Sequence, residues 1–333
     1  MIVGVGGVVE ALLAADEPSV VLATRRDVLN EPGSSLVELG ERVRESPRAR
    51  ALIAGVHPGS VYNKWHGAHW VLADLADMGY PTAAPELTKL RDRVLDHWLG
   101  PEFYAEYEAS SKAAAYGKAG VPIIAGRYRR CGSQHGNALR SIVRLGIADG
   151  RAEQLVERLH HWQWPDGGWN CDRNPSADTS SFMETLLPMR GLAAYATWRD
   201  DESARERARA AAEVFLSREL FRRRRDGKPM VPGFLKLHHP LYWHYDVLGG
   251  LRAMAELDLL GDPRCAAALD LLESKRLPDG GWPAEAKFYT TSDDPQNGTT
   301  AVDWGGTSGR RMNPWVTVQA LSVLVKAGRT LEV

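Results

Sequence analysis

Cysteine is scarce in this sequence, and so are long apolar runs and any excess of charge of one sign. Only three cysteines, Cys131, Cys171 and Cys265, occur among the 333 residues. An odd and low number of cysteines argues against a disulfide framework and indicates a reducing compartment. We therefore expect a cytoplasmic protein.

The charges are balanced, with 41 basic and 42 acidic residues and a formal net charge of −1. Such a balance argues against wholesale binding of nucleic acid. The N-terminal stretch MIVGVGGVVEALLAADEP is apolar, but Glu10 interrupts it and no basic residues precede it. It has neither the length of a transmembrane segment nor the layout of a signal peptide. A peripheral contact with a membrane stays open.

Strand-like alternation of apolar and polar residues is also rare, whereas apolar residues at helical spacing are frequent. Five segments share this helical pattern: 63–79, 130–146, 179–195, 241–257 and 312–328. A more charged helical segment follows each of the first four: 86–99, 151–162, 202–219 and 263–275. None of these hairpins can bury its apolar face alone, so successive copies must pack on one another.

This alternation predicts an all-α fold, in which apolar inner helices and charged outer helices form a closed ring, an α/α toroid. We expect five to six helical hairpins in a single domain. Residues 57–333 carry the repeats, and residues 1–56 form an N-terminal helical segment that completes the ring.

Two connections between these hairpins contain the same string, PDGGW, within QWPDGGW at 163–169 and RLPDGGW at 276–282. The Asp and Gly residues predict a tight turn, and we expect Trp169 and Trp282 to wedge between neighbouring hairpins. Gln163, Asp166 and the Gly-Gly-Trp that follows resemble the QW motif of the terpenoid cyclase and protein prenyltransferase superfamily, which includes the squalene cyclases. Arg276 stands where that motif has Gln.

The resemblance extends over residues 57–328. It implies a toroid whose inner helices surround a central cavity, with an isoprenoid or other apolar small molecule as ligand. Counting eleven residues back from the end of each inner segment gives one row of residues: Ala68, His135, Glu184, Asp246 and Thr317. Three ionisable groups in one row would be costly in a purely structural core, so we expect a shared pocket. The alternative is that these groups cap helices or face neighbouring hairpins.

Class II terpene cyclases protonate their substrate with a DxDD motif, which is absent here. The nearest string, Ser-Ala-Asp-Thr-Ser at 176–180, has one carboxylate, Asp178. The resemblance therefore implies that acid and base roles fall to some of His135, Asp178, Glu184 and Asp246. Aromatic residues gather at the helix starts, and in such cyclases ring faces stabilise carbocations. The expected substrate-binding residues are Trp65, Tyr242, Trp243, Tyr245, Trp315 and Thr317. Filling of a helical core is the alternative for each ring.

Protein prenyltransferases hold zinc with Asp, Cys and His, and their Asp-x-Cys segment is reduced here to Asp-Thr-Ser at 178–180. The resemblance places His244 near the zinc histidine, with Cys171 as a possible thiolate. Cys131 and His135, four residues apart on one helix, offer a second pair of zinc ligands. Zinc is the one cofactor for which the sequence offers ligands. The alternative is that these cysteines are buried and inert.

We expect a terpene-cyclase-like enzyme that acts by acid/base chemistry. The alternatives are zinc-dependent prenyl transfer, a non-catalytic toroid that binds a hydrophobic ligand, and a glycan-acting barrel with Glu184 and Asp246 as a carboxylate pair. The long connection 283–312 is either a lid over the cavity mouth or a disordered loop. The oligomeric state stays open.

Overall fold

The computed structural model describes residues 6–329, and this part of the chain is built from α-helices joined by loops and a few very short strands. The prediction of an all-α fold is confirmed. The chain forms two compact units: unit 1 comprises residues 1–83 and 218–333, and unit 2 comprises residues 84–217. The closed ring and its single-domain organisation stay predictions.

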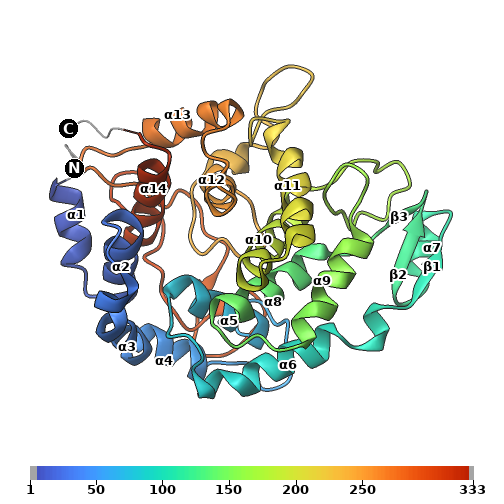
Figure 1. The fold of residues 1–333 in the computed structure, drawn as a ribbon, viewed down its shortest axis with the longest axis horizontal. Helices are drawn as coiled ribbons and strands as arrows, with labels where there is room; N and C mark the ends of the chain where they lie inside the picture. Colours follow the sequence, from blue (N-terminus) through green and yellow to red (C-terminus); the bar gives the residue numbers. More distant parts are fainter. Residues whose placement is uncertain (1–5, 330–333) are drawn as a thin grey trace. The chain divides into compact units, whose positions relative to one another are not determined.

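Unit 2 contains two predicted inner helices and three predicted outer ones, within one or two residues of most expected bounds. Its longer helices are α6 (Thr88–Trp98), α8 (Gly132–Arg144), α9 (Arg151–Trp162), α10 (Phe182–Arg199) and α11 (Glu202–Leu216), and its short ones are η3 (Pro85–Leu87) and η4 (Pro101–Phe103). Helix α10 packs on α8 and α11, and α8 packs on α6 and α9 (Figure 1). The inner helices α8 and α10 are buried along most of their length, as their apolar pattern predicts.

Helices α8 and α10 approach each other to backbone contact. A Cβ atom at Gly136 would overlap the backbone of Pro188, and one at Gly191 would overlap the carbonyl of Gly136. Only glycine allows two helices to come this close. The crossing brings the first turns of both helices together, which positions the side chains described below.

Unit 2 also contains a small sheet that the sequence pattern does not predict. Its strands are β1 (Glu106–Glu108), β2 (Val121–Ile124) and β3 (Arg127–Tyr128), and helix α7 (Lys112–Tyr116) joins the first two. Strand β1 pairs with β2 in parallel, and β2 pairs with β3 in antiparallel fashion. Strands this short carry too few residues to show alternation, so the pattern of apolar residues does not predict them.

Unit 1 is made from both ends of the chain. Its longer helices are α1 (Gly6–Leu13), α2 (Pro18–Ala23), α3 (Val37–Glu45), α4 (Pro47–Ala54), α5 (Ala68–Met78), α12 (Val247–Glu256), α13 (Ala266–Ser274) and α14 (Pro314–Lys326). Its short elements are η1 (Thr24–Val28), η2 (Gly33–Leu36), η5 (Pro232–Leu235), η6 (Pro263–Cys265), β4 (Thr290–Thr291) and β5 (Thr299–Thr300). Helix α14 packs on α2, η1 and α12, so the red and blue ends of the ribbon lie side by side (Figure 1). Within the predicted N-terminal segment 1–56, helices α1–α4 are joined by η1, η2 and short loops, and residues 1–5 lie outside the described residues.

The segment 283–312 is described throughout and has defined contacts within unit 1. Trp304 is 1% exposed, and its carbonyl accepts a hydrogen bond from Asn313 Nδ2 at 2.8 Å. Glu285 forms an ion pair of 2.8 Å with Lys275, and β4 pairs with β5 in parallel. The segment therefore packs as part of the unit, and its role as a lid stays a prediction.

The two PDGGW turns are built alike. The indole Nε1 of Trp169 donates to the carbonyl of Leu159 at 3.0 Å, and that of Trp282 donates to the carbonyl of Leu272 at 2.7 Å. Both tryptophan side chains are completely buried. The carbonyl of the first glycine accepts from Gln163 Nε2 in one turn, and the corresponding carbonyl accepts from Arg276 Nε in the other.

A threonine in the following inner helix holds each of these tryptophans through its backbone. Thr185 Oγ1 accepts from the N–H of Trp169 at 3.1 Å, and Thr317 Oγ1 accepts from the N–H of Trp282 at 2.9 Å. Thr185 and Thr317 are therefore structurally equivalent. The predicted structural role of the PDGGW strings agrees with these contacts.

Candidate functional site

The N-cap residues of the predicted inner helices show which positions in these helices are equivalent. These positions differ from the row of ionisable residues expected from the sequence. The N-cap residues are Gly67, Cys131, Ser181, Asp246 and Asn313. His135, Thr185 and Thr317 each lie four residues after the N-cap of their helix. Glu184 lies three residues after its N-cap, and Asp246 is itself an N-cap. The expectation that His135, Glu184 and Asp246 share one row is wrong. Helix lengths differ, from 10 residues in α12 to 18 in α10, so counting back from helix ends shifted the register.

Glu184 lies in the first turn of α10 and reaches the start of α8. Its Oε2 atom accepts hydrogen bonds from Ser133 N at 3.2 Å and Ser133 Oγ at 2.8 Å. Its Oε1 atom lies 3.4 Å from the Sγ atom of Cys171. Burial raises the pKa of Glu184, although the bonds from Ser133 and Cys171 and the charge of Arg130 act in the opposite direction. The structure thus holds this predicted acid in a specific hydrogen-bonded position.

Two predicted zinc ligands come together with Glu184. The Sγ atoms of Cys131 and Cys171 and a carboxylate oxygen of Glu184 all lie within 4.8 Å of one another. Cys131 begins α8, and Cys171 follows the turn that Trp169 anchors. A hydrogen bond with Cys131, burial and the charge of Glu184 raise the pKa of the Cys171 thiol. All three side chains are partly exposed, so the cluster is accessible.

A guanidinium group lies beside this cluster. Arg130 packs over the rings of Phe103, Trp98 and Trp162, at 4.7, 5.9 and 5.8 Å from their centroids. Its Nε and Nη2 atoms are buried without a hydrogen-bond partner among the described residues. Burial lowers the pKa of Arg130, and the nearby Cys131 and Glu184 partly oppose this shift.

The other two acid/base residues predicted in unit 2 lie elsewhere. His135 is completely buried, and its Nε2 atom lies 3.1 Å from the carbonyl oxygen of Trp98. Its ring meets that of Trp162 edge-on at 5.0 Å. Asp178 is exposed in the loop that leads to α10. Neither belongs to the group of metal-ligand atoms formed by Cys131, Cys171 and Glu184.

The aromatic residues predicted in unit 1 form a stack at the start of α5. Trp65 lies on Tyr242 with ring centroids 3.7 Å apart and an angle of 6° between the planes. Trp70 meets both rings edge-on, at 4.8 and 5.6 Å. The Nε1 atom of Trp65 donates to the carbonyl of Phe288 at 2.8 Å, which joins the stack to the segment 283–312. We call Trp65, Trp70 and Tyr242 the aromatic stack.

Asp74 lies one helical turn after Trp70 on α5 and was not among the residues predicted from the sequence. It is 4% exposed, and its Oδ2 atom has no hydrogen-bond partner among the described residues. Burial raises the pKa of Asp74 well above its usual value, and the negative charge of Asp77 adds to the shift. Burial and the charge of Asp74 raise the pKa of Tyr242. The signal for Asp74 was a carboxylate inside the apolar run AHWVLADLADM.

Asp246, by contrast, is fully engaged by the protein. Its Oδ1 atom accepts from Gly249 N at 2.6 Å, as an N-cap does, and its Oδ2 atom accepts from His238 N at 2.9 Å. The same Oδ2 atom lies 2.9 Å from Nδ1 of His238, and both side chains are 1% exposed. Burial acts to lower the pKa of His238, but the charge and hydrogen bond of Asp246 outweigh it, so the pKa is raised. These contacts describe a structural ion pair and cap.

His244 lies in unit 1, in a second group of rings. It stacks between Trp243 and Phe288, at centroid distances of 4.1 and 3.6 Å. The ammonium group of Lys64 lies over Trp243 at 5.1 Å. Burial and the charges of His238 and Lys64 lower the pKa of His244 to about 3, so its imidazole is neutral at physiological pH.

The remaining predicted substrate-binding residues contact other parts of the unit 1 core. Trp315 stacks on His239 at 4.9 Å and 7°, and meets Trp304 edge-on at 5.1 Å. The hydroxyl of Tyr245 donates to the carbonyl of Leu220 at 2.7 Å. Thr317 anchors the turn at Trp282, as described above. For Tyr245 and Thr317 these contacts show a structural role.

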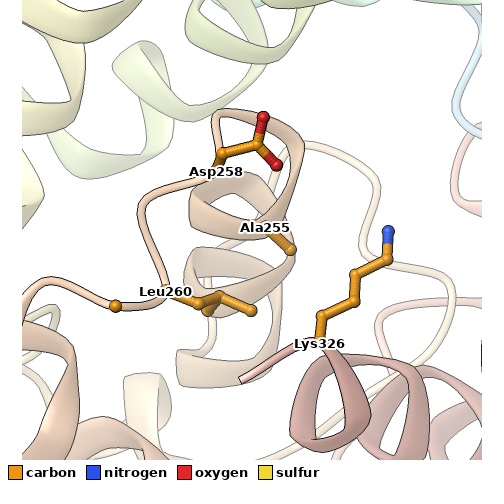
Figure 2. Close-up of a pocket in the computed structure, with 5 residues that line it drawn as sticks. Ala255, Asp258, Leu260 and Lys326 are labelled. Atoms are coloured by element: carbon orange, nitrogen blue, oxygen red, sulfur yellow. The ribbon is translucent and has the colours of Figure 1, made fainter. Parts of the chain in front are cut away.

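A separate pocket of about 330 Å³ opens on unit 1 and contains none of the predicted site residues. It lies near the ends of α12 and α14, where the side chain of Lys326 lies across from Ala255 and Leu260 and Asp258 lies at the top of the view (Figure 2). Its openness to solvent and the small number of side chains around it distinguish it from the buried groups above. We assign it no role.

No helix within residues 6–329 is both long enough and apolar enough to cross a lipid bilayer. No protein-family model matches the sequence, and no curated protein matches it. A solved structure of the type II terpene cyclase MstE from Scytonema, in complex with the product merosterolic acid A, is similar to this chain with a TM-score of 0.41. The two sequences are 14% identical, and the alignment covers 93% of this chain and 86% of that chain.

Proposed function

We propose that this chain is a terpene-cyclase-like enzyme that transfers a proton to an isoprenoid or similar apolar molecule. The observation that carries the proposal is Asp74, a buried carboxyl group one helical turn from Trp70 in the aromatic stack. A general acid must hold its proton at the working pH, and burial is the means by which proteins keep a carboxyl group protonated. The resemblance of the PDGGW turns to the QW motif agrees with this class of enzyme.

The chemistry needs an acid and a means to stabilise the cation that forms. When Asp74 gives its proton to a carbon–carbon double bond, a carbocation and a carboxylate form together. These opposite charges attract each other strongly in a site of low dielectric constant. The ring faces of the aromatic stack stabilise the cation further, because aromatic rings carry negative charge on their faces. Return of a proton from the cation to the carboxylate ends the reaction, so the net change is an isomerisation.

The other carboxyl and imidazole groups predicted as acids have different roles in this proposal. Asp246 and His135 accept or share hydrogen bonds with the protein and so position α12 and α8. Asp178 is exposed, where solvent competes for its proton. Glu184 is a partly exposed carboxyl, and its neighbours suit a different task, which we describe below.

The test is to incubate the full chain in D₂O with a panel of linear isoprenoid alcohols, diphosphates and hydrocarbons. We expect a cyclised or isomerised product that carries deuterium from the solvent. The Asp74→Asn variant keeps the shape of the side chain but not its acid, so turnover should fall by about a hundredfold or more. Asp293→Asn, at an exposed position, serves as the matched control and should retain full activity.

Two results would overturn the proposal. Unchanged product formation in Asp74→Asn would remove Asp74 as the acid. Binding of a panel member by calorimetry, with no product from the unmodified protein, would support the alternative of a non-catalytic protein that binds a hydrophobic ligand.

A further inference from the structure

We propose that Cys131, Cys171 and Glu184 bind a zinc ion in unit 2 and leave its fourth coordination position open. The sequence offered the two cysteines as ligands, but it paired them with histidines. The structure replaces those histidines with a carboxylate. This site is independent of the acid chemistry proposed for Asp74, because all its ligands lie within residues 84–217.

The distances between the ligand atoms suit zinc. The metal binds thiolate sulfur at about 2.3 Å and carboxylate oxygen at about 2.0 Å, so tetrahedral ligands lie about 3.5–3.8 Å apart. The Sγ atom of Cys171 lies 3.4 Å from Oε1 of Glu184, and all three ligand atoms fall within 4.8 Å. Small side-chain rotations are therefore enough to complete the geometry.

Rigid elements hold each ligand in place. Cys131 is the N-cap of α8, and Glu184 lies in the first turn of α10. These two helices are fixed against each other by the close crossing at Gly136. Cys171 follows Trp169, whose indole and backbone are both hydrogen-bonded. Sites built on such elements are more precise than sites on free loops.

Ser133 supports the ligand that the sequence did not predict. Its N–H and Oγ–H both donate to Oε2 of Glu184, which leaves Oε1 directed toward Cys171. Hydrogen bonds of this kind orient metal-binding carboxylates and are a regular part of metal sites. Oε1 of Glu184 is therefore the proposed zinc ligand, and Oε2 is the oxygen that Ser133 holds in place.

The charges around the site also balance. Two thiolates and one carboxylate carry three negative charges, and zinc supplies two positive charges. Arg130 supplies the third, and its Nε and Nη2 atoms have no hydrogen-bond partner among residues 6–329. Buried guanidinium nitrogens without hydrogen-bond acceptors are costly, and a deprotonated cluster that holds zinc would provide a counter-charge beside them.

Three protein ligands give the arrangement of a catalytic zinc site. Structural zinc ions have four protein ligands, whereas catalytic ones keep a position for water or substrate. The partial exposure of Cys131, Cys171 and Glu184 leaves such a position accessible. We infer that an oxygen or sulfur atom of a small molecule takes this fourth position.

The test is the zinc content of the full, tag-free chain by plasma mass spectrometry after dialysis against a weak chelator. We expect about one zinc ion per chain. Cys131→Ser, Cys171→Ser and Glu184→Gln should each weaken zinc binding at least tenfold, and Ser133→Ala should weaken it less. Cys265→Ser is the matched control, because Cys265 is a free cysteine in unit 1, and it should retain zinc.

A second readout uses cobalt in place of zinc. Cobalt bound by two thiolates should give a sulfur-to-metal charge-transfer band that Cys131→Ser and Cys171→Ser each diminish and that Cys265→Ser preserves. Circular dichroism tests whether each variant is folded. If Glu184→Gln does not fold, the zinc content and cobalt spectra of the two cysteine variants test the proposal.

Two outcomes would overturn the inference. One is zinc affinity that is the same in the unmodified chain and in the double variant of Cys131 and Cys171. The other is a disulfide between these two cysteines in protein purified under reducing conditions. Neither outcome bears on Asp74, and loss of activity in Asp74→Asn should leave the zinc content unchanged.

Discussion

Burial and the negative charge of Asp77 determine how the proton of Asp74 responds to pH. Asp77 raises its pKa, and Asp77 itself lies 3.7 Å from Arg252. Tyr242 also interacts with Asp74, and burial together with the charge of Asp74 raises the pKa of Tyr242. Because the active form in the proposed reaction is the protonated acid, we expect activity to be lost as the pH rises through the raised pKa of Asp74.

The corresponding prediction concerns Asp77→Asn. Removing the charge of Asp77 lowers the pKa of Asp74, so the loss of kcat/KM at high pH should begin at a lower pH than in the unmodified chain. Beyond that point the rate should fall by about tenfold per pH unit. The infrared C=O stretch of the protonated carboxyl, absent in Asp74→Asn, gives the same titration without a substrate. A profile unaffected by Asp77→Asn would contradict this account.

The ion pair of His238 and Asp246 gives a prediction about stability. The pKa of His238 is raised above its usual value of 6.5, so its contribution to stability is fully present below pH 6.5 and is lost as pH rises through the folded-state pKa. Asp246→Asn removes the charge partner of a buried group, which should cost about 3 kcal/mol at low pH. Urea unfolding at several pH values should show a smaller difference between the two proteins above the folded-state pKa of His238. A difference that grows with pH would be the opposite of this expectation.

At the scale of single elements, the threonines of α10 and α14 connect each inner helix to its preceding turn. Thr185→Val and Thr317→Val keep the shape of the side chain but leave a buried backbone N–H of tryptophan without its acceptor. Each change should lower the free energy of unfolding by about 1–3 kcal/mol. Thr197→Val is the control, because the exposed Thr197 only donates back to the carbonyl of Ala193. Equal denaturation midpoints for all three variants would contradict the anchoring role.

The helices could be predicted from the sequence because each inner helix is buried over most of its surface and each outer helix over one face. The apolar spacing of α8, α9 and α10 follows directly from this difference. The strands β1–β3 could not be predicted, since two to four residues carry no measurable period. The predicted register of the inner helices was wrong for another reason. Periodicity indicates that a helix is present but does not show at which residue it begins.

The site was predicted only in part, because its members are distant in sequence. Cys131 and Cys171 were candidate ligands, but their proximity to Glu184 depends on how closely α8 and α10 cross at Gly136. The role proposed for Asp74 depends on the burial of its side chain. A single carboxylate in an apolar stretch of sequence does not show whether it is buried. Contacts of this kind arise from tertiary packing, and spacing along one segment contains no information about them.

At the scale of the whole molecule, unit 1 depends on both ends of the chain. Helix α14 packs on α2 and η1, and Val8 of α1 contacts the turn at Gly280. Deletion of residues 1–54 would remove apolar side chains such as Leu12, Val20 and Val28, which are at most 1% exposed, and would uncover the face of α14 that packs on α2 and η1.

We therefore expect the deletion variant to lose amide-exchange protection in α12 and α14 but to retain it in α8 and α10. Hydrogen–deuterium exchange with mass spectrometry measures both regions in one experiment. Equal loss of protection in all four helices would show that the two units do not have independent stability.

The division of unit 1 between both ends of the chain has a consequence for synthesis on the ribosome. Residues 84–217 emerge as one continuous stretch and can fold before translation ends. Helices α1–α5 emerge before this stretch but must wait for α12 and α14, the last of which ends at Lys326. During that interval their apolar faces are open to solvent, so the nascent chain is a natural client for chaperones that bind near the ribosomal exit. A segment that is made before residues 84–217 thus reaches its final structure after them.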